Sequence, residues 1–285
     1  MGLTGVNPSY SGVAIATTNG GATWTIENMP QPVADLDGVS CVSASDCVAV
    51  GATGAYSPTT TGFGWNAGII LQSPEGYSLA AADGGVFSFG DAGFYGSMGG
   101  KSLNAPIVGI ASTPDGKGYW EVAADGGVFA FGDAGFYGSM GGKSLNAPIV
   151  GIASTPDGKG YWEVAADGGV FSFGDAGFHG SMGAKSLNAR IVAIAADSST
   201  AGYWMVASDG GVFAFDAPFL GSMGGKSLNA PVVGITPGPD MGGYWLVASD
   251  GGIFAFGNAS FNGSMGAKRL NKPVVGMAAV SGMSP

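Results

Sequence analysis

Short apolar runs separated by glycine-rich turns follow one another along most of the chain. In residues 107–148 the runs are Ile107–Ser112, Tyr119–Ala124, Val128–Phe131 and Phe136–Met140. They are rich in β-branched and aromatic side chains, and the Asp-Gly and Gly-Gly pairs between them supply the positive φ angles that tight hairpin turns need. No stretch shows the 3.6-residue apolar period of a helix. The pattern therefore predicts four antiparallel strands in this unit.

The same unit recurs with a nearly constant period. Residues 89–129 reappear unchanged at 131–171, and the glycine that opens the Gly-Tyr-Trp-x-Val-Ala-x-Asp-Gly-Gly pattern recurs at spacings of 42, 42, 42 and 41 residues. These glycines are Gly76, Gly118, Gly160, Gly202 and Gly243. Four-stranded units of this length, apolar on both faces, are typical of β-propeller blades, which cover each other by packing radially. We therefore expect an all-β chain that forms one β-propeller domain over residues 1–285.

The number of blades follows from the innermost strands. The last candidate strand, 273–279, has no partner strands in its own copy, whereas Gly12–Thr17 and Ala22–Ile26 near the N-terminus could complete its sheet. We expect seven blades in a ring closed by pairing of the C-terminal strand with the N-terminal blade, which would cover the exposed strand edges. Six blades remain the alternative, because the second blade is thin. The seven candidate strands are 37–42, 68–72, 107–112, 149–154, 191–196, 231–236 and 273–279.

Composition excludes several classes of protein. With 46% hydrophobic residues, 16 Phe, 9 Tyr and 6 Trp, the chain can form a large core and is not disordered. No apolar run approaches 18 residues, so we expect no membrane-spanning helix. The net charge of −10 repels phosphate backbones, so we expect no nucleic-acid partner. We expect a monomer.

Two cysteines indicate the compartment. Cys41 and Cys47 lie on the apolar arms of a predicted hairpin around Ser-Ala-Ser-Asp, whose geometry could bring the sulfur atoms within bonding range. A disulfide there favours a secreted or cell-surface protein. A metal site is the rival interpretation, but the single histidine, His179, lies far along the chain. Residues 1–10 are too polar for a signal peptide, so we expect a mature protein or an excised domain.

Two known families resemble parts of the chain. Residues 76–280 resemble the glycine- and aromatic-rich repeats with Gly-Tyr-Trp and Asp-Gly-Gly that occur in arrays within secreted bacterial proteins, often beside cell-wall hydrolases or peptidases. Residues 1–72 resemble an Asp-box (BNR, sialidase-type) propeller segment, since Thr17–Trp24 follows Ser-x-Asp-x-Gly-x-x-Trp with Thr for Ser and Asn for Asp. The resemblances imply Asp-box-like blades in 1–72, then five repeats and a closing strand in 73–285. They imply no sialidase activity, because the only arginines are Arg190 and Arg269.

The chain offers few residues for catalysis. One histidine and no His-Glu spacing leave neither a zinc site nor a Ser-His-Asp triad, and we expect no metal and no cofactor. Among the acids outside the repeat pattern, Asp35, Asp37 and Glu75 are weak candidates for a hydrolase or lyase site at the channel mouth. The Asp-Leu-Asp segment is equally typical of the polar start of a strand. Glu121 and Glu163 are copies of one residue by duplication, and they indicate little about chemistry.

Repeated binding is the function that the pattern favours. The Asp-Gly-Gly turn and the Lys-Ser-Leu-Asn loop of each repeat should emerge on one face, and linked weak sites there would gain affinity for a polymer. We therefore predict a non-catalytic extracellular module that binds a glycan or cell-wall polysaccharide. A structural or protein-interaction module is the alternative, in which each Asp only caps its turn. The candidate binding residues are Trp120, Trp162, Trp204, Trp245, Asp125, Asp167, Asp209, Asp250, Lys143, Lys185, Lys226, Asn146, Asn188 and Asn229.

Overall fold

The chain forms two compact units, residues 1–65 and 66–285. The computed structural model describes residues 76–90, 92–238 and 240–277, and outside these ranges only the backbone of five short strands. Those strands are β1 (Ala14–Ala16), β2 (Thr25–Glu27), β3 (Asp35–Cys41), β4 (Cys47–Ala52) and β5 (Ile70–Ser73). In the first unit, β1 pairs with β2 and β3 pairs with β4, both antiparallel.

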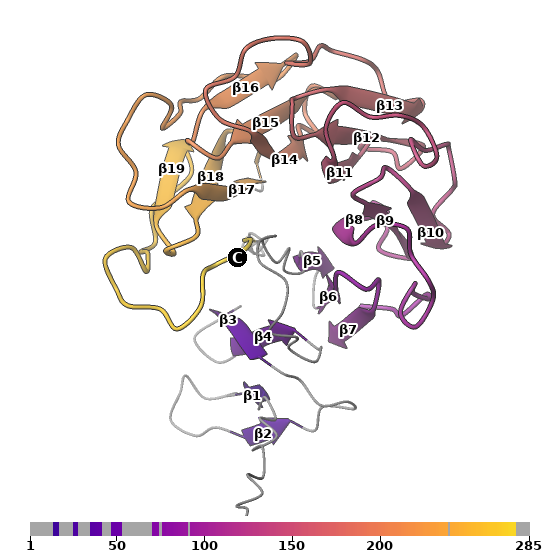
Figure 1. Ribbon diagram of the computed structural model, residues 1–285. Coiled ribbons are helices and arrows are strands. Elements are labelled where there is room, and N and C mark those ends of the chain that lie inside the picture. Colours follow the sequence, from indigo (N-terminus) through magenta and orange to yellow (C-terminus); the bar gives the residue numbers. More distant parts are fainter. Residues whose placement is uncertain are drawn as a thin grey trace, which may run out of the picture. The chain divides into compact units, whose positions relative to one another are not determined.

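The second unit contains five three-stranded antiparallel sheets, each built from consecutive strands with the second strand in the middle (Figure 1). The first sheet joins β5 to β6 (Gly76–Ala80) and β7 (Val86–Gly90). The others are β8 (Ile107–Ser112), β9 (Gly118–Ala123) and β10 (Val128–Gly132); β11 (Ile149–Ser154), β12 (Gly160–Ala165) and β13 (Val170–Gly174); β14 (Ile191–Ala196), β15 (Tyr203–Ala207) and β16 (Val212–Phe215); and β17 (Val232–Pro237), β18 (Gly243–Ala248) and β19 (Ile253–Gly257).

Successive sheets of this unit pack against each other through their first strands. β8 lies beside β11, β11 beside β14 and β14 beside β17, whereas the third strand of each sheet lies outermost (Figure 1). One backbone hydrogen bond recurs at each junction: the N–H of Ile149 donates to the carbonyl of Ala124, and that of Ile191 to the carbonyl of Ala166, both at 2.9 Å. The described residues contain no helix. An all-β array of such sheets is consistent with a β-propeller.

The core lies between consecutive sheets, as the apolar runs predict. Trp120 of β9, 0% exposed, packs on Tyr161 of β12 with ring centroids 5.5 Å apart, and Tyr161 in turn lies 5.6 Å from Phe173. Ile149 and Ile152 of β11 join the same cluster. Because the sheets present apolar side chains on both faces, they bury these side chains by packing against neighbouring sheets. The repeats therefore depend on each other for burial.

The predicted fourth strand is wrong in the repeats that the structure describes. Residues 136–140 form no strand, and Gly138 has a φ of 129°. Aromatic side chains bind the backbone of this segment instead. The hydroxyl of Tyr161 donates to the carbonyl of Gly138 at 2.5 Å and accepts from the N–H of Tyr137 at 3.3 Å, and the indole N–H of Trp120 donates to the carbonyl of Gly135 at 2.7 Å. With these groups already bonded, the segment joins no β-ladder.

Several expectations fall on residues outside the described ranges. These are the Asp-box-like segment 17–24, the side chains of Cys41 and Cys47, Glu75, and the last part of the predicted closing strand. The backbone of β3 and β4 does confirm a hairpin, and its register pairs Cys41 directly with Cys47. No helix among the described residues is long and apolar enough to cross a membrane.

Candidate functional site

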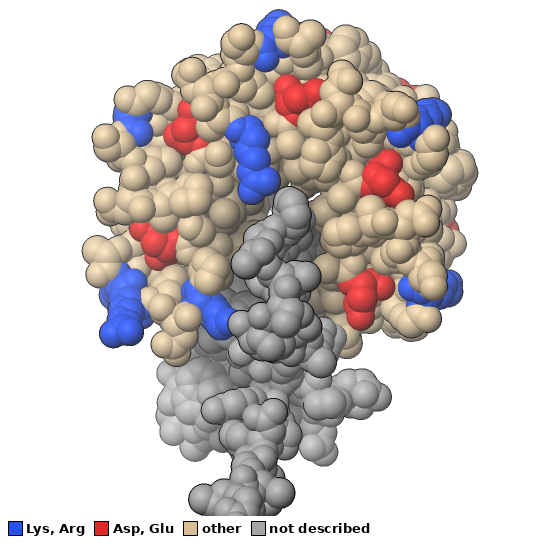
Figure 2. Space-filling view, viewed as in Figure 1, with Lys and Arg blue, Asp and Glu red and all other residues tan. Residues whose placement is uncertain are grey.

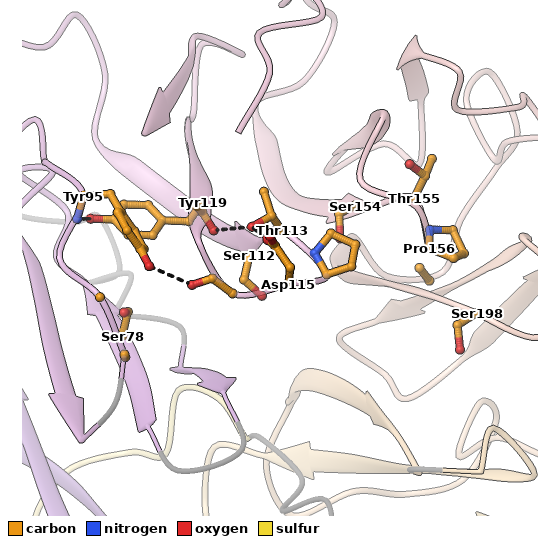
Figure 3. A pocket seen from close by; sticks show the side chains of 16 residues that line it. Ser78, Tyr95, Ser112, Thr113, Asp115, Tyr119, Ser154, Thr155, Pro156 and Ser198 are labelled. Atoms are coloured by element: carbon orange, nitrogen blue, oxygen red, sulfur yellow. Dashed lines mark hydrogen bonds between the residues drawn. The ribbon is translucent and has the colours of Figure 1, made fainter. Parts of the chain in front are cut away.

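A pocket with a volume of about 430 Å³ opens in the second unit, beside the turns that connect the first and second strands of three consecutive sheets, β8–β9, β11–β12 and β14–β15 (Figure 3). We call it the turn pocket. Antiparallel strands place these turns at the opposite end of each sheet from the Asp-Gly-Gly turns. Four successive repeats form its wall. The lining residues are Ser78, Ala92, Gly93, Tyr95, Ser112, Thr113, Pro114, Asp115, Gly116, Gly118, Tyr119, Ser154, Thr155, Pro156, Ala196 and Ser198.

The turn between β8 and β9 is held by its own polar side chains. The hydroxyl of Thr113 lies 3.0 Å from the Asp115 carboxylate, 3.2 Å from the Asp133 carboxylate and 3.2 Å from the carbonyl of Gly118. The N–H of Lys117 donates to Asp115 Oδ1 at 3.2 Å. A carboxylate that accepts a backbone N–H two residues ahead is a common way to close such a turn. The turn is therefore ordered without a ligand.

Asp115 carries a stable negative charge at the rim of the pocket. The backbone N–H of Lys117 donates a hydrogen bond to this carboxylate, and the Lys117 ammonium lies 3.1 Å from Asp115 Oδ2. The Thr113 hydroxyl donates a further hydrogen bond. These contacts favour the ionised form and lower the pKa of Asp115 to about 2. Asp115 therefore stays ionised through the neutral and mildly acidic pH range and can accept hydrogen bonds at the rim of the pocket.

Two tyrosines form another side of the pocket. The hydroxyl of Tyr95 donates to the carbonyl of Gly116 at 3.2 Å, so its ring is held against the turn (Figure 3). The ring of Tyr119 lies 5.9 Å from that of Tyr95, and its hydroxyl donates to the carbonyl of Gly96 at 2.6 Å. Tyr119 is buried, whereas Tyr95 is 37% exposed. Tyr95 is thus the aromatic surface that a ligand could contact.

The duplication places a second, identical turn beside the first. Thr155 lies 3.0 Å from Asp157, and Lys159 lies 3.2 Å from Asp157, matching the contacts in the first copy. Ser154, Thr155 and Pro156 of this second turn line the same pocket. The described lining therefore combines several hydroxyl groups, proline surface, two tyrosine rings and one carboxylate. It offers binding groups, and not the paired carboxyl groups of glycoside hydrolysis.

Three of the four candidate tryptophans are core residues, which corrects their predicted role. Trp120, Trp162 and Trp204 are 0%, 1% and 0% exposed, and each indole N–H donates to a backbone carbonyl of its own repeat. A buried ring with its N–H bonded has no face for a sugar. Trp245 is half-buried, and its N–H donates to the carbonyl of Ser260 at 2.8 Å.

The other candidate binding residues lie on the opposite face from the turn pocket. Asp125, like its equivalents, accepts the N–H of the glycine two residues ahead, at 2.9–3.0 Å, as an ordinary turn cap. The lysines and asparagines of this set are exposed, and the ammonium of Lys143 lies 6.0 Å from the ring centre of Phe173. Acidic and basic side chains alternate around the face seen in Figure 2 without a continuous patch of one sign. Asp35 and Asp37 are described only as backbone in β3.

The residues of the turn pocket were missed by sequence reasoning. The signal was present, because Ser-Thr-Pro-Asp-Gly-Lys occurs identically at 112–117 and 154–159. This motif predicted a turn, but it did not indicate a binding site. Only the packing of adjacent repeats brings the two turns and Tyr95 around one cavity.

No protein-family model and no curated protein matches the sequence. Many solved structures resemble the chain. One is the crystal structure of the Cps50 (Swd1) β-propeller domain from Myceliophteria thermophila, which is 13% identical, with a TM-score of 0.49 over 70% of this chain and 67% of that one. A likeness at this level carries no information on function, and the propeller interpretation depends on the sheets themselves. The bacterial repeat and Asp-box families remain resemblances of the sequence.

Proposed function

We propose that this chain is a non-catalytic β-propeller module that binds a glycan or cell-wall polysaccharide in the turn pocket. The observation that supports it most is the lining of a 430 Å³ cavity by hydroxyl groups, the ionised Asp115 and the ring of Tyr95. Pockets of roughly 300–1,000 Å³ are the usual size for small ligands. A sugar residue has hydroxyls for the carboxylate and an apolar face for the tyrosine ring.

The finer features of the fold are part of the same proposal. We propose seven blades, a ring completed through the C-terminal strand, a Cys41–Cys47 disulfide, and a secreted or cell-surface location. The register that places the two cysteines opposite each other supports the disulfide. Within the second unit, the N–H of Val274 donates to the carbonyl of Ser249 at 2.8 Å, as Ile149 does to Ala124. This bond supports the proposal that residues 273–277 begin a further blade.

Binding to a glycan array, followed by calorimetry with the best ligand, tests the site. Asp115→Asn keeps the shape of the turn but removes the charge, and we expect it to weaken binding by about tenfold, equivalent to about 1.4 kcal/mol. Tyr95→Ala removes the aromatic surface and should weaken binding at least as much.

The matched control is Asp125→Asn, the same change on the opposite face. It should leave affinity unchanged. If Asp125→Asn weakens binding and Asp115→Asn does not, the site belongs to the Asp-Gly-Gly face. If neither the unchanged chain nor its variants bind any glycan, the proposed function is wrong.

One observation favours a protein-interaction module as the second candidate. Each described repeat exposes one phenylalanine at the same position, with 61–63% of its surface accessible. Replacing Phe219 and Phe261 by serine separates the two functions, because neither these residues nor their chain neighbours line the turn pocket. The exposed phenylalanines are Phe94, Phe136, Phe178, Phe219 and Phe261.

A further inference from the structure

Two glutamates are buried between successive repeats. Glu121 on β9 and Glu163 on β12 are both 0% exposed. Their four carboxyl oxygens are the buried side-chain atoms without a hydrogen-bond partner in the part of the chain that the structure describes. The equivalent residues in the other repeats are Leu79, Met205 and Leu246, all apolar and buried. The acids therefore occupy core positions.

Each acid faces the preceding repeat. A methyl group built on Gly126 would lie 3.0 Å from Glu163 Oε2, which places this carboxyl against the Asp-Gly-Gly turn of the neighbouring sheet. The charged groups near Glu163 are Asp125 and Lys143 of that repeat, and the neutral Tyr161 hydroxyl lies on its own strand. For Glu121 the corresponding groups are Asp83, Lys101 and Tyr119. We call these two contacts the acidic joints.

The backbone differs at an acidic joint. At joints without an acid, the N–H of Met182 donates to the carbonyl of Gly168, and that of Met223 to the carbonyl of Gly210, both at 2.9 Å. At the Glu163 joint, the carbonyl of Gly126 accepts instead from Gly141 at 2.9 Å. The backbone N–H of Met140 lies near the Glu163 carboxyl and lowers its pKa. The two groups do not meet the geometry of a hydrogen bond, so the carboxyl oxygens have no hydrogen-bond partner among the described residues.

Burial dominates the electrostatics of both carboxyls. An unpaired charge in a dry contact is strongly disfavoured, so such a group keeps its proton. Burial raises the pKa of Glu121 to about 7 and that of Glu163 to about 8, from an ordinary value of 4.5. The lysines and the methionine N–H groups oppose this effect, and the nearby aspartates reinforce it.

We propose that Glu121 and Glu163 make the contact between neighbouring repeats sensitive to pH: the neutral acids pack like the leucine and methionine of other repeats, and their ionisation loosens the two acidic joints. In the unfolded chain both carboxyls lose their protons near 4.5, whereas in the folded chain they keep them to about 7 and 8. The folded state binds more protons across this interval. Stability therefore falls as pH rises from about 4.5 to about 8, and this contribution is level above that.

Thermal unfolding of the full chain between pH 5 and pH 9 tests the proposal. Glu121→Leu with Glu163→Met installs the residues of the equivalent positions, so the double variant should fold. We expect the wild-type midpoint to fall with pH by roughly 10 °C more than that of the double variant. Asp240→Asn, which removes an exposed acid, should keep the wild-type dependence. Parallel curves for the wild type and the double variant would overturn the proposal.

Infrared spectroscopy reports the proton directly. At pH 6 the wild type should show the carbonyl band of protonated carboxylic acids, lost on raising the pH to 9 and absent from the double variant. A merely structural role for the glutamates would not produce this band. If the wild type and the double variant have the same spectrum at pH 6, the acids are ionised and the proposal is wrong. Neither measurement depends on the glycan.

Discussion

At the scale of single residues, one tyrosine hydroxyl per repeat binds the backbone segment that was predicted to form a fourth strand. The hydroxyls of Tyr119, Tyr161, Tyr203 and Tyr244 donate to glycine carbonyls of the preceding repeat at 2.6, 2.5, 2.5 and 2.6 Å. Their rings are 0–2% exposed, so each hydroxyl lies at the end of a core side chain. A buried ring can therefore position the outer segment of its neighbour without a β-ladder.

We expect Tyr161→Phe to destabilise the chain by about 1–3 kcal/mol, because the Gly138 carbonyl and the Tyr137 N–H both lose a partner. Urea unfolding measures the loss. Tyr137→Phe is the control, since the Tyr137 hydroxyl donates one hydrogen bond, to the carbonyl of Gly158, and this bond is only partly buried. Equal losses for the two variants would show that the buried hydroxyl has no special role.

At the scale of elements, the outer segment of each repeat depends on a glycine next to an aromatic ring. Gly138 has a φ of 129°, and a Cβ there would meet Phe173 Cδ1 at 2.8 Å. Gly96 and Gly180 repeat this arrangement against Phe131 and Phe215. Because these glycines have no Cβ, the backbone of the outer segment can contact the aromatic ring of the next sheet.

Gly138→Ala should therefore destabilise the chain by more than 1 kcal/mol, through both the φ angle and the contact with Phe173. Gly142→Ala is the matched control. Its φ is 75° and nothing lies within 4 Å of its Cβ, and alanines occupy the equivalent positions 184 and 267 at φ 63° and 67°. Chemical unfolding of both variants checks this, and a larger effect of Gly142→Ala would contradict it.

At the scale of the whole molecule, burial is shared between repeats. Each cluster of buried side chains combines residues from two consecutive sheets, so removing one sheet exposes its neighbour. The last described residues of the second unit, 273–277, lie against the sheet of β17, β18 and β19: the hydroxyl of Thr236 donates to the carbonyl of Met277 at 2.8 Å, and the N–H of Val274 donates to the carbonyl of Ser249 at 2.8 Å. These residues cover the last sheet.

A chain ending at 272 should consequently unfold at a lower temperature than a chain ending at 277, because it loses both bonds and exposes β17. Comparing these two truncations isolates residues 273–277 from the residues that follow. Thermal unfolding gives the difference. Identical midpoints would mean that the segment adds nothing to the stability of the array, and would remove the support for a ring completed there.

By itself the sequence determined the first three strands of each described repeat, the turns between them and the period, because apolar alternation and the φ angles of Asp-Gly turns are local properties. β8, β9 and β10 lie where the runs Ile107–Ser112, Tyr119–Ala124 and Val128–Phe131 predict, within one residue. The tertiary structure decided that residues 136–140 form no strand, that Trp120 is core and that Thr113, Asp115 and Tyr95 share a pocket. Each of these features depends on contacts between repeats. Because the repeats are nearly identical, no local sequence pattern distinguishes a side chain that a neighbouring repeat buries from one that is exposed to a ligand.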